Sequence, residues 1–198
     1  MRYLLTFCMA LSAMVGCSGQ DHEPVLLPMP QEVAWTKGTF HGREVNLCGE
    51  SSVTGIVRSW LDETGVKCSE SAAKRLEVKL VERIDRAVVN QEEAYRLTVS
   101  PKSIRIEAVT EKGGYWAVQT LRQLAETERH GVRIPCCEIT DWPAFRIRGF
   151  MHDTGRSFID PEEIKHEIEV LSRYKINTFH WHLTENQAWR MVSKLYPQ

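Results

Sequence analysis

The chain has 198 residues, of which 42% are hydrophobic and 26% are charged, and this composition is typical of a globular protein with one or two domains. Its formal net charge of −1 gives no electrostatic footprint for nucleic acid, so that class of partner is excluded. After residue 20, no segment approaches the roughly 18 consecutive apolar residues of a membrane-spanning helix.

The first twenty residues predict export from the cytoplasm. Arg2 supplies a positive start, residues 4–15 form an apolar run, and small residues precede Cys17. Residues 14–17, which read MVGC, resemble the end of a bacterial lipoprotein signal, in which Cys17 is lipidated. An ordinary signal peptide with an incidental cysteine is the alternative. We therefore expect an exported bacterial protein, periplasmic or anchored to the outer membrane, that contacts a membrane only through an N-terminal lipid.

The remaining cysteines have no catalytic or zinc-binding pattern. Export permits disulfides, and Cys48 with Cys68 could close a short loop. The spacing contains no C-x-x-C pair, so a zinc site is not expected. Cys136 and Cys137 are best explained as small buried hydrophobic residues.

Residues 21–142 predict a small α+β domain. An extended lead-in occupies 21–30. Alternating or apolar patterns then predict these elements in order: a strand at 40–47, a helix at 51–64, strands at 76–80, 95–99 and 104–108, a helix at 115–129 opened by a solvated turn at Gly113-Gly114, and a strand at 132–139. This order favours one sheet with helices on one face. Asp141-Trp142-Pro143 marks a boundary, because proline cannot continue a central strand.

A strand, helix, strand unit follows this boundary. Residues 145–153 predict a strand. Asp160 caps the next helix and Pro161 occupies its first turn, while Arg173 and Lys175 lie near the negative end of its dipole. The helix carries one apolar stripe, made of Ile164, Ile168, Leu171 and Tyr174. Residues 176–183 predict a second strand, parallel to the first through a right-handed crossover.

Both predicted strands end in polar chemistry. Residues 148–157 read RGFMHDTGRS, and residues 177–190 read NTFHWHLTENQAWR. Polar groups at the carboxyl ends of parallel strands are how an α/β barrel builds its active site. A complete barrel needs about 250 residues. We therefore expect residues 143–198 to form the first part of a (β/α)₈ TIM barrel, truncated after about two strands.

These two motifs resemble glycoside hydrolase family 20, the β-N-acetylhexosaminidases. The first strand of that family's barrel typically reads R-G-x-x-x-D-x-S-R-H, and its second reads N-x-x-H-x-H-L-x-D-D-Q-x-W-R. Upstream, LPMPQ at 27–31 and GGYWAVQTL at 113–121 are similar to the small domain that precedes the barrel in the family. The resemblance covers nearly the whole chain after residue 20.

The resemblance implies an exo-acting enzyme that removes terminal N-acetylglucosamine or N-acetylgalactosamine from glycans, with no cofactor. Hydrolysis in this family is retaining and substrate-assisted, because the acetamido oxygen of the substrate attacks the anomeric carbon. The family's catalytic Asp-Glu pair lies on a later barrel strand and has no counterpart here, so this chain is expected to be inactive alone. The alternative is a non-catalytic exported lipoprotein that binds glycans or proteins.

The resemblance assigns roles to Arg156 and Glu185, and two further residues are expected to support the site. Arg156 matches the arginine that grips the outer ring hydroxyls of the sugar, a task that suits a fork of fixed donors. Glu185 matches an aspartate that supports the catalytic glutamate through a histidine, while Asp153 and His182 are supporting residues. Asp153 either faces the site or locks the following loop. Gly155 and Ser157 depart from the family pattern, which has Ser and His at these positions.

Two other patterns have competing explanations. His180 and His182 are two apart on one strand, so they point the same way and offer the start of a zinc site, although packed barrel histidines are favoured and no metal is expected. Asp62-Glu63 is an adjacent Asp-Glu pair, but it falls near the end of a helix in the small domain. It lacks the histidine and glycines that precede the catalytic pair of the family.

Overall fold

The computed structural model describes residues 23–49, 52–186 and 188–196. The expected signal segment and Cys17 lie outside these residues. In the described part of the chain, no helix is both long enough and apolar enough to cross a membrane.

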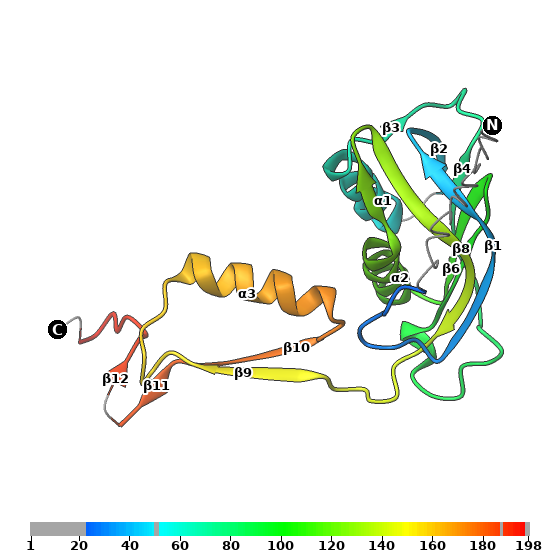
Figure 1. The fold of residues 1–198 in the computed structure, drawn as a ribbon. Helices are drawn as coiled ribbons and strands as arrows, with labels where there is room; N and C mark the ends of the chain where they lie inside the picture. Colours follow the sequence, from blue (N-terminus) through cyan, green and yellow to red (C-terminus); the bar gives the residue numbers. More distant parts are fainter. Residues whose placement is uncertain (1–22, 50–51, 187, 197–198) are drawn as a thin grey trace, which may run out of the picture.

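The first domain is built on one mixed eight-stranded sheet (Figure 1). Its main path follows the order β1-β8-β5-β6-β4-β2-β3, and β7 pairs with β8. Neighbours are antiparallel from β1 to β6 and parallel from β6 to β3. The strands are β1 (Glu32–Gly42), β2 (Glu44–Cys48), β3 (Lys67–Cys68), β4 (Arg75–Leu80), β5 (Tyr95–Val99), β6 (Ser103–Ala108), β7 (Glu126–Glu128) and β8 (Gly131–Asp141). A 3₁₀ turn, η1 (Gln91–Glu93), precedes β5.

Two helices cover one face of this sheet, as the sequence predicted (Figure 1). Helix α1 (Ser52–Glu63) buries Val53, Val57, Trp60 and Leu61, and it ends before Gly65, whose φ of 70° is the left-handed conformation expected of a cap. Helix α2 (Glu111–Leu124) packs beside α1 and over β5 and β6. Both helices and the inner face of the sheet contribute to one continuous hydrophobic core.

The prediction of a solvated turn at Gly113-Gly114 was wrong. Both glycines are buried inside α2, which begins at Glu111 after the cap Thr110. A Cβ on Gly113 would lie 2.5 Å from the carbonyl oxygen of Ala94, and one on Gly114 would lie 2.5 Å from Val53 Cγ2. The glycines are therefore needed because the helix backbone approaches its neighbours too closely for any side chain.

Several strand boundaries also differ from the expectation. The single strand predicted at 40–47 is the end of β1 and most of β2, and the first part of β1 was missed because a bulge between Trp35 and Thr39 breaks its alternation. The second helix stops at Leu124 rather than at 129. Residues Glu126–Glu128 form β7 instead, since they pair with β8 in a hairpin.

Cys48 and Cys68, which could have formed a disulfide, are not joined, and all four cysteines of the described residues are free. Strands β2 and β3 pair with Val45 opposite Cys68, so Cys48 lies three residues further along β2. At about 3.3 Å per residue this separates the two α-carbons by roughly 10 Å, beyond the reach of a disulfide. Cys136 and Cys137 are buried as predicted, and burial raises the pKa of the Cys137 thiol to about 12.

The second unit extends from the first domain as a strand, helix, strand arrangement (Figure 1). Strands β9 (Gly149–Asp153) and β10 (Thr178–His182) are parallel neighbours, and helix α3 (Pro161–Arg173) connects them. The side chain of Asp160 caps α3 by accepting a hydrogen bond of 2.9 Å from the backbone of Glu162. Two short strands, β11 (Thr184–Glu185) and β12 (Ala188–Trp189), form a hairpin after β10.

The apolar stripe of α3 is only partly buried. Ile164 is 2% exposed, whereas Ile168 and Tyr174 are 42% and 50% exposed. Two strands are too narrow to cover the whole stripe.

Among the described residues, one part-buried ion pair and one buried ion pair join this unit to the first domain. Arg148 Nη2 donates to Glu93 Oε2 at 2.5 Å, and Trp116 Nε1 donates to the same carboxylate oxygen at 2.6 Å. The Arg148 guanidinium also lies over the Trp116 ring, 5.4 Å from its centroid, and Arg148 Nε donates to the carbonyl of Lys175 at 2.7 Å. The start of β9 is thus fixed to η1 and α2.

Lys175 forms the second pair, which corrects its predicted role near the helix dipole. Lys175 is 5% exposed and has a φ of 61°. The chain therefore turns at the end of α3, and the ammonium group of Lys175 points into the junction between the two units. Lys175 Nζ donates to Asp141 Oδ2 at 2.7 Å and to the hydroxyl of Tyr95 at 2.9 Å. Burial lowers the pKa of Lys175 and raises that of Tyr95, because both charged forms lose water.

Candidate functional site

The parallel pairing of β9 and β10 brings the carboxyl ends of both strands together. Asp153, the last residue of β9, lies opposite His182, the last residue of β10. The loop that leaves β9 then carries Arg156, and the chain that leaves β10 carries Glu185. Residues that are separated by about thirty positions in the sequence therefore meet at one edge of the two strands.

Arg156 contacts both carboxylates at this edge. Its Nε lies 3.1 Å from Asp153 Oδ2, and its Nη2 lies 3.4 Å from Glu185 Oε1. Asp153 Oδ1 also accepts a hydrogen bond of 3.1 Å from the backbone N–H of Arg156. One carboxylate therefore both locks the loop and holds the arginine side chain. The arginine side chain is 72% exposed, so its other donors face solvent.

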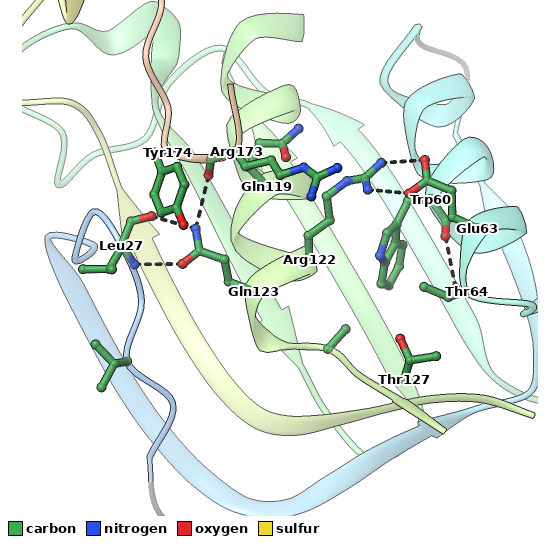
Figure 2. Close-up of a pocket in the computed structure, with 12 residues that line it drawn as sticks. Leu27, Trp60, Glu63, Thr64, Gln119, Arg122, Gln123, Thr127, Arg173 and Tyr174 are labelled. Atoms are coloured by element: carbon green, nitrogen blue, oxygen red, sulfur yellow. Dashed lines mark hydrogen bonds and ion pairs between the residues drawn. The ribbon is translucent and has the colours of Figure 1, made fainter. Parts of the chain in front are cut away.

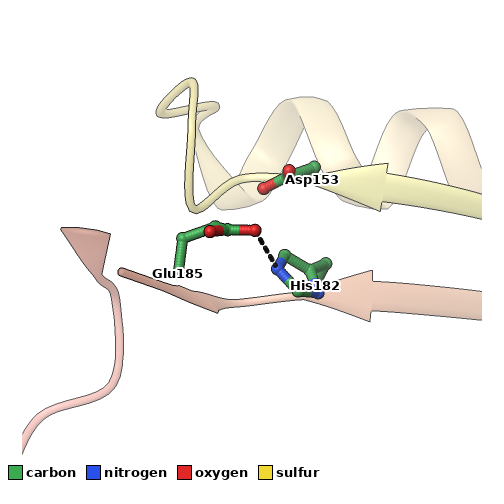
Figure 3. Close-up of side chains that lie close together, drawn as sticks. All are labelled: Asp153, His182 and Glu185. Atoms are coloured by element: carbon green, nitrogen blue, oxygen red, sulfur yellow. Dashed lines mark ion pairs between the residues drawn. The ribbon is translucent and has the colours of Figure 1, made fainter. Parts of the chain in front are cut away.

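His182, at the end of β10, and Glu185, in β11, lie close together (Figure 3). His182 Nε2 lies 3.3 Å from Glu185 Oε1, the oxygen that also contacts Arg156. The second oxygen, Oε2, accepts a hydrogen bond of 3.2 Å from the backbone N–H of Asn186. Glu185 is thus placed between an arginine and a histidine.

The geometry does not favour the alternative zinc site that used His180 and His182. Within the described part of the chain, the group that offers metal-ligand atoms within 4.8 Å of one another is instead Asp153, His182 and Glu185, without His180. The Arg156 guanidinium already lies against both carboxylates of this group. A cation bound there would face the repulsion of a fixed positive charge at hydrogen-bonding distance.

The surroundings lower the pKa of both carboxyl groups. For Asp153, partial burial raises the pKa, but the Arg156 N–H bond and the charges of His182 and Arg156 together lower it below its ordinary value. For Glu185, the Asn186 N–H bond contributes most to the lowered pKa, followed by the hydrogen bond and charge of Arg156. Both groups therefore stay ionised at pH values where a free carboxyl is partly protonated.

These lowered pKa values predict how the stability of the loop depends on pH. Since the folded pKa lies below the unfolded one, each carboxylate stabilises the loop above its ordinary pKa, and this contribution is lost as the pH falls through the folded pKa. We expect carbon NMR of the Asp153 and Glu185 carboxyl groups to titrate below the ordinary range of about 3.9 to 4.3. The NMR signal of the Arg156 Nε–H should shift over the same pH range as the two carboxyl signals. Titration of both carboxyls at or above that range would contradict the ion-pair geometry.

The sequence did not identify the residues that hold the loop itself. Thr154 is 2% exposed, and its Oγ1 accepts a hydrogen bond of 2.9 Å from Trp181 Nε1. Arg190, after β12, donates to two carbonyls of the same loop. Backbone acceptors leave no trace in the pattern of side chains, so only the family motif, which includes this arginine, drew attention to the segment.

The Asp62-Glu63 pair lies in a different part of the molecule. Glu63 lines a cavity of about 590 Å³ between α1, α2 and the end of α3, where Arg122 donates to both of its carboxylate oxygens, at 2.5 and 3.0 Å (Figure 2). These hydrogen bonds lower the pKa of Glu63. A carboxylate held in this way is a poor general acid, because catalysis of that kind needs a raised pKa.

Two family models match the chain. The model described as "Glycosyl hydrolase family 20, domain 2" matches residues 23–142, and the one described as "Glycosyl hydrolase family 20, catalytic domain" matches residues 145–198.

Curated relatives carry names in agreement with these models. The chain is 32% identical over 190 residues to a beta-hexosaminidase from Porphyromonas gingivalis and 34% identical over 177 residues to one from Vibrio furnissii. Both alignments cover 87% of this chain, but only 24% and 28% of the relatives. The chain thus spans about a quarter of the length of the curated relatives that it matches.

Solved structures share the fold. An exo beta-N-acetylglucosaminidase from Vibrio harveyi, solved in complex with N-acetylglucosamine, superposes with a TM-score of 0.71 at 32% identity, covering 87% of this chain and 27% of that one. A beta-N-acetylhexosaminidase from Bacteroides fragilis superposes with a TM-score of 0.70 at 30% identity, covering 87% and 35%.

Proposed function

Because the chain belongs to glycosyl hydrolase family 20, we propose that it is the N-terminal portion of an exo-acting β-N-acetylhexosaminidase. The substrate is a glycan that ends in N-acetylglucosamine or N-acetylgalactosamine, and hydrolysis is substrate-assisted and retaining. The protein is exported, with Cys17 as the lipid attachment site. In this proposal, β9, α3 and β10 are the first strand, helix and strand of a (β/α)₈ barrel.

The juxtaposition of Arg156 with Asp153 and Glu185 is the observation that carries the proposal. A guanidinium has five N–H donors, and the two ion pairs engage one on Nε and one on Nη2. The remaining donors face solvent at the carboxyl ends of the strands, where barrel enzymes bind their substrates. Donors fixed in a plane suit adjacent hydroxyl oxygens on a sugar ring, so Arg156 would bind the outer hydroxyls of the terminal residue.

Glu185 and His182 have a supporting role in this mechanism. The family's acid-base glutamate protonates the leaving oxygen and later activates water, while its partner aspartate orients the acetamido group. Neither residue is supplied by the motifs of this chain. Glu185 would keep its charge beside the sugar site and orient a histidine next to the glutamate, as the corresponding aspartate does in the family. The carboxylate of Glu185 lies against both Arg156 and His182.

An activity assay tests whether this chain supplies only binding and supporting residues and not the catalytic pair. We expect the 198-residue chain to show no turnover of a chromogenic N-acetyl-β-glucosaminide, since the acid-base glutamate and the acetamido-binding aspartate are both missing from it. The coding DNA should continue in frame beyond codon 198 to an H-x-G-G-D-E motif, and the longer product should hydrolyse the same substrate. Turnover by the 198-residue chain would contradict the proposed site. A stop codon after Gln198 would favour a non-catalytic binding lipoprotein.

A further inference from the structure

The loop that carries Arg156 is held by one side chain from the hairpin beyond β10. Arg190 Nε donates to the carbonyl oxygen of Thr154 at 2.9 Å, and Arg190 Nη2 donates to that of Gly155 at 3.3 Å. The same guanidinium lies over the ring of Phe158, 5.6 Å from its centroid. One planar group therefore engages two successive carbonyls and an aromatic ring of the β9–α3 connection.

Strand β10 holds the opposite side of this loop. The backbone N–H groups of Thr154 and Gly155 both donate to the carbonyl of His182, at 3.0 and 3.3 Å. Trp181 Nε1 donates to Thr154 Oγ1 at 2.9 Å. Both the N–H groups and the C=O groups of residues 154 and 155 are thus engaged, so the loop has little freedom to rotate.

Close packing adds a third constraint at Gly155. A Cβ at this position would lie 3.1 Å from Asp153 Oδ1 and 3.2 Å from Glu185 Cβ. The loop backbone is therefore pressed against the two carboxylate side chains that contact Arg156. A shift of the loop by a few tenths of an ångström would change the distances from the guanidinium to both carboxylates.

We infer that Arg190 is a positioning residue for Arg156, which it serves by fixing the carbonyls of the two preceding residues. The importance of this for sugar binding rests on the proposed function, whereas the fixing of the loop does not. Lysine could donate to either carbonyl but lacks the planar fork that reaches both and stacks on Phe158. Glutamine is uncharged and shorter than arginine, so it loses both the positive charge and the reach to the two carbonyls.

Hydrogen exchange in the 198-residue chain tests the positioning directly. We expect Arg190→Gln to speed exchange of the amides of Thr154, Gly155 and Arg156 about tenfold or more, and Arg190→Lys to have an intermediate effect. The Arg156 Nε–H NMR signal should move toward that of a solvated arginine. Exchange within α2 and β5 should not change. Arg173→Gln, which removes a surface pair with Glu169 on α3, is the matched control and should leave all three loop amides protected.

A second variant guards against misfolding of the first. Trp181→Phe keeps an aromatic ring but removes the N–H donor to Thr154 and part of the ring volume, and it should speed exchange of the same amides to a smaller degree. Unchanged loop exchange and an unchanged Arg156 signal in Arg190→Gln, with the fold intact, would overturn the inference. If Arg190→Gln does not fold, unchanged exchange in Trp181→Phe and Arg190→Lys would overturn it equally.

Kinetics on the longer enzyme separate this inference from the proposed function. Arg190→Gln should lower kcat/KM for an N-acetylglucosaminide about tenfold, mainly through KM, with Arg190→Lys in between. If the loop amides respond but the longer wild-type protein hydrolyses no hexosaminide, the proposed function fails and the positioning role stands. If the wild type is active but neither loop exchange nor KM responds, the positioning role fails alone.

Discussion

Replacing Lys175 by methionine should lower the free energy of unfolding by about 3–5 kcal/mol, the usual cost of removing one partner of a buried ion pair. The loss leaves the Asp141 carboxyl group without its cation in a site where only 10% of its side chain is exposed, and it removes a donor to the Tyr95 hydroxyl. Methionine matches lysine in length and lacks β-branching, so the strain of the positive φ at residue 175 stays similar. Urea unfolding of the 198-residue chain, followed by tryptophan fluorescence, measures the change.

Two further variants make this prediction specific to the buried charge. Lys165→Met removes an exposed lysine of α3 that pairs with Glu162 on the surface, and it should change the free energy of unfolding by less than about 0.5 kcal/mol. Asp141→Asn combined with Lys175→Met removes both charges and should regain a large part of the loss. Equal stabilities for Lys175→Met and Lys165→Met would show that the junction does not depend on this pair.

Replacing Arg156 by methionine in the longer, active enzyme should reduce kcat/KM for N-acetyl-β-glucosaminides about 100-fold or more. Each hydrogen bond between a charged donor and a substrate hydroxyl contributes about 1.5–3 kcal/mol, and about 1.4 kcal/mol corresponds to a tenfold change in rate. The variant also leaves Asp153 and Glu185 facing each other without their shared cation. Steady-state kinetics on a chromogenic substrate would measure this loss.

Arg146→Met is the matched control for this variant. Arg146 is exposed in the segment that leads into β9, so it lies toward the opposite end of that strand from Arg156. Its replacement removes the same charge, and kcat/KM should stay within about twofold, as is usual for surface substitutions away from a site. Similar losses in both variants would mean that Arg156 acts through the general charge of the protein.

The sequence predicted those helix boundaries that are set by residues next to them in the chain. Asp160 and Pro161 mark the start of α3 by capping chemistry, and Gly65 marks the end of α1 by its left-handed conformation. Strand β7 had no such signal, because all three of its residues are exposed and only its pairing with β8 makes it a strand. Gly113 and Gly114 were misread because the neighbours that exclude a Cβ, Ala94 and Val53, are distant in sequence.

For the candidate site too, the sequence indicated some of the important residues and missed others. The family motifs indicated Arg156, Asp153, His182 and Glu185, and the structure brings these residues together at the ends of β9 and β10. Their roles stay predictions until a substrate is bound. The residues of the junction were not found, because Lys175 meets partners 34 and 80 positions away. A charged residue at the end of a helix is ordinarily read as solvent-exposed, and no local pattern distinguishes the buried case.

A crystal structure of the longer enzyme with bound N-acetylglucosamine is the most direct test of the assignment of Arg156. We predict that its guanidinium donates to ring hydroxyl oxygens of the sugar at about 2.7–3.2 Å. At the same time, Asp153 and Glu185 should keep their contacts with it. An amino sugar bound elsewhere in the barrel, with the Arg156 guanidinium beyond hydrogen-bonding distance of every hydroxyl, would contradict the account.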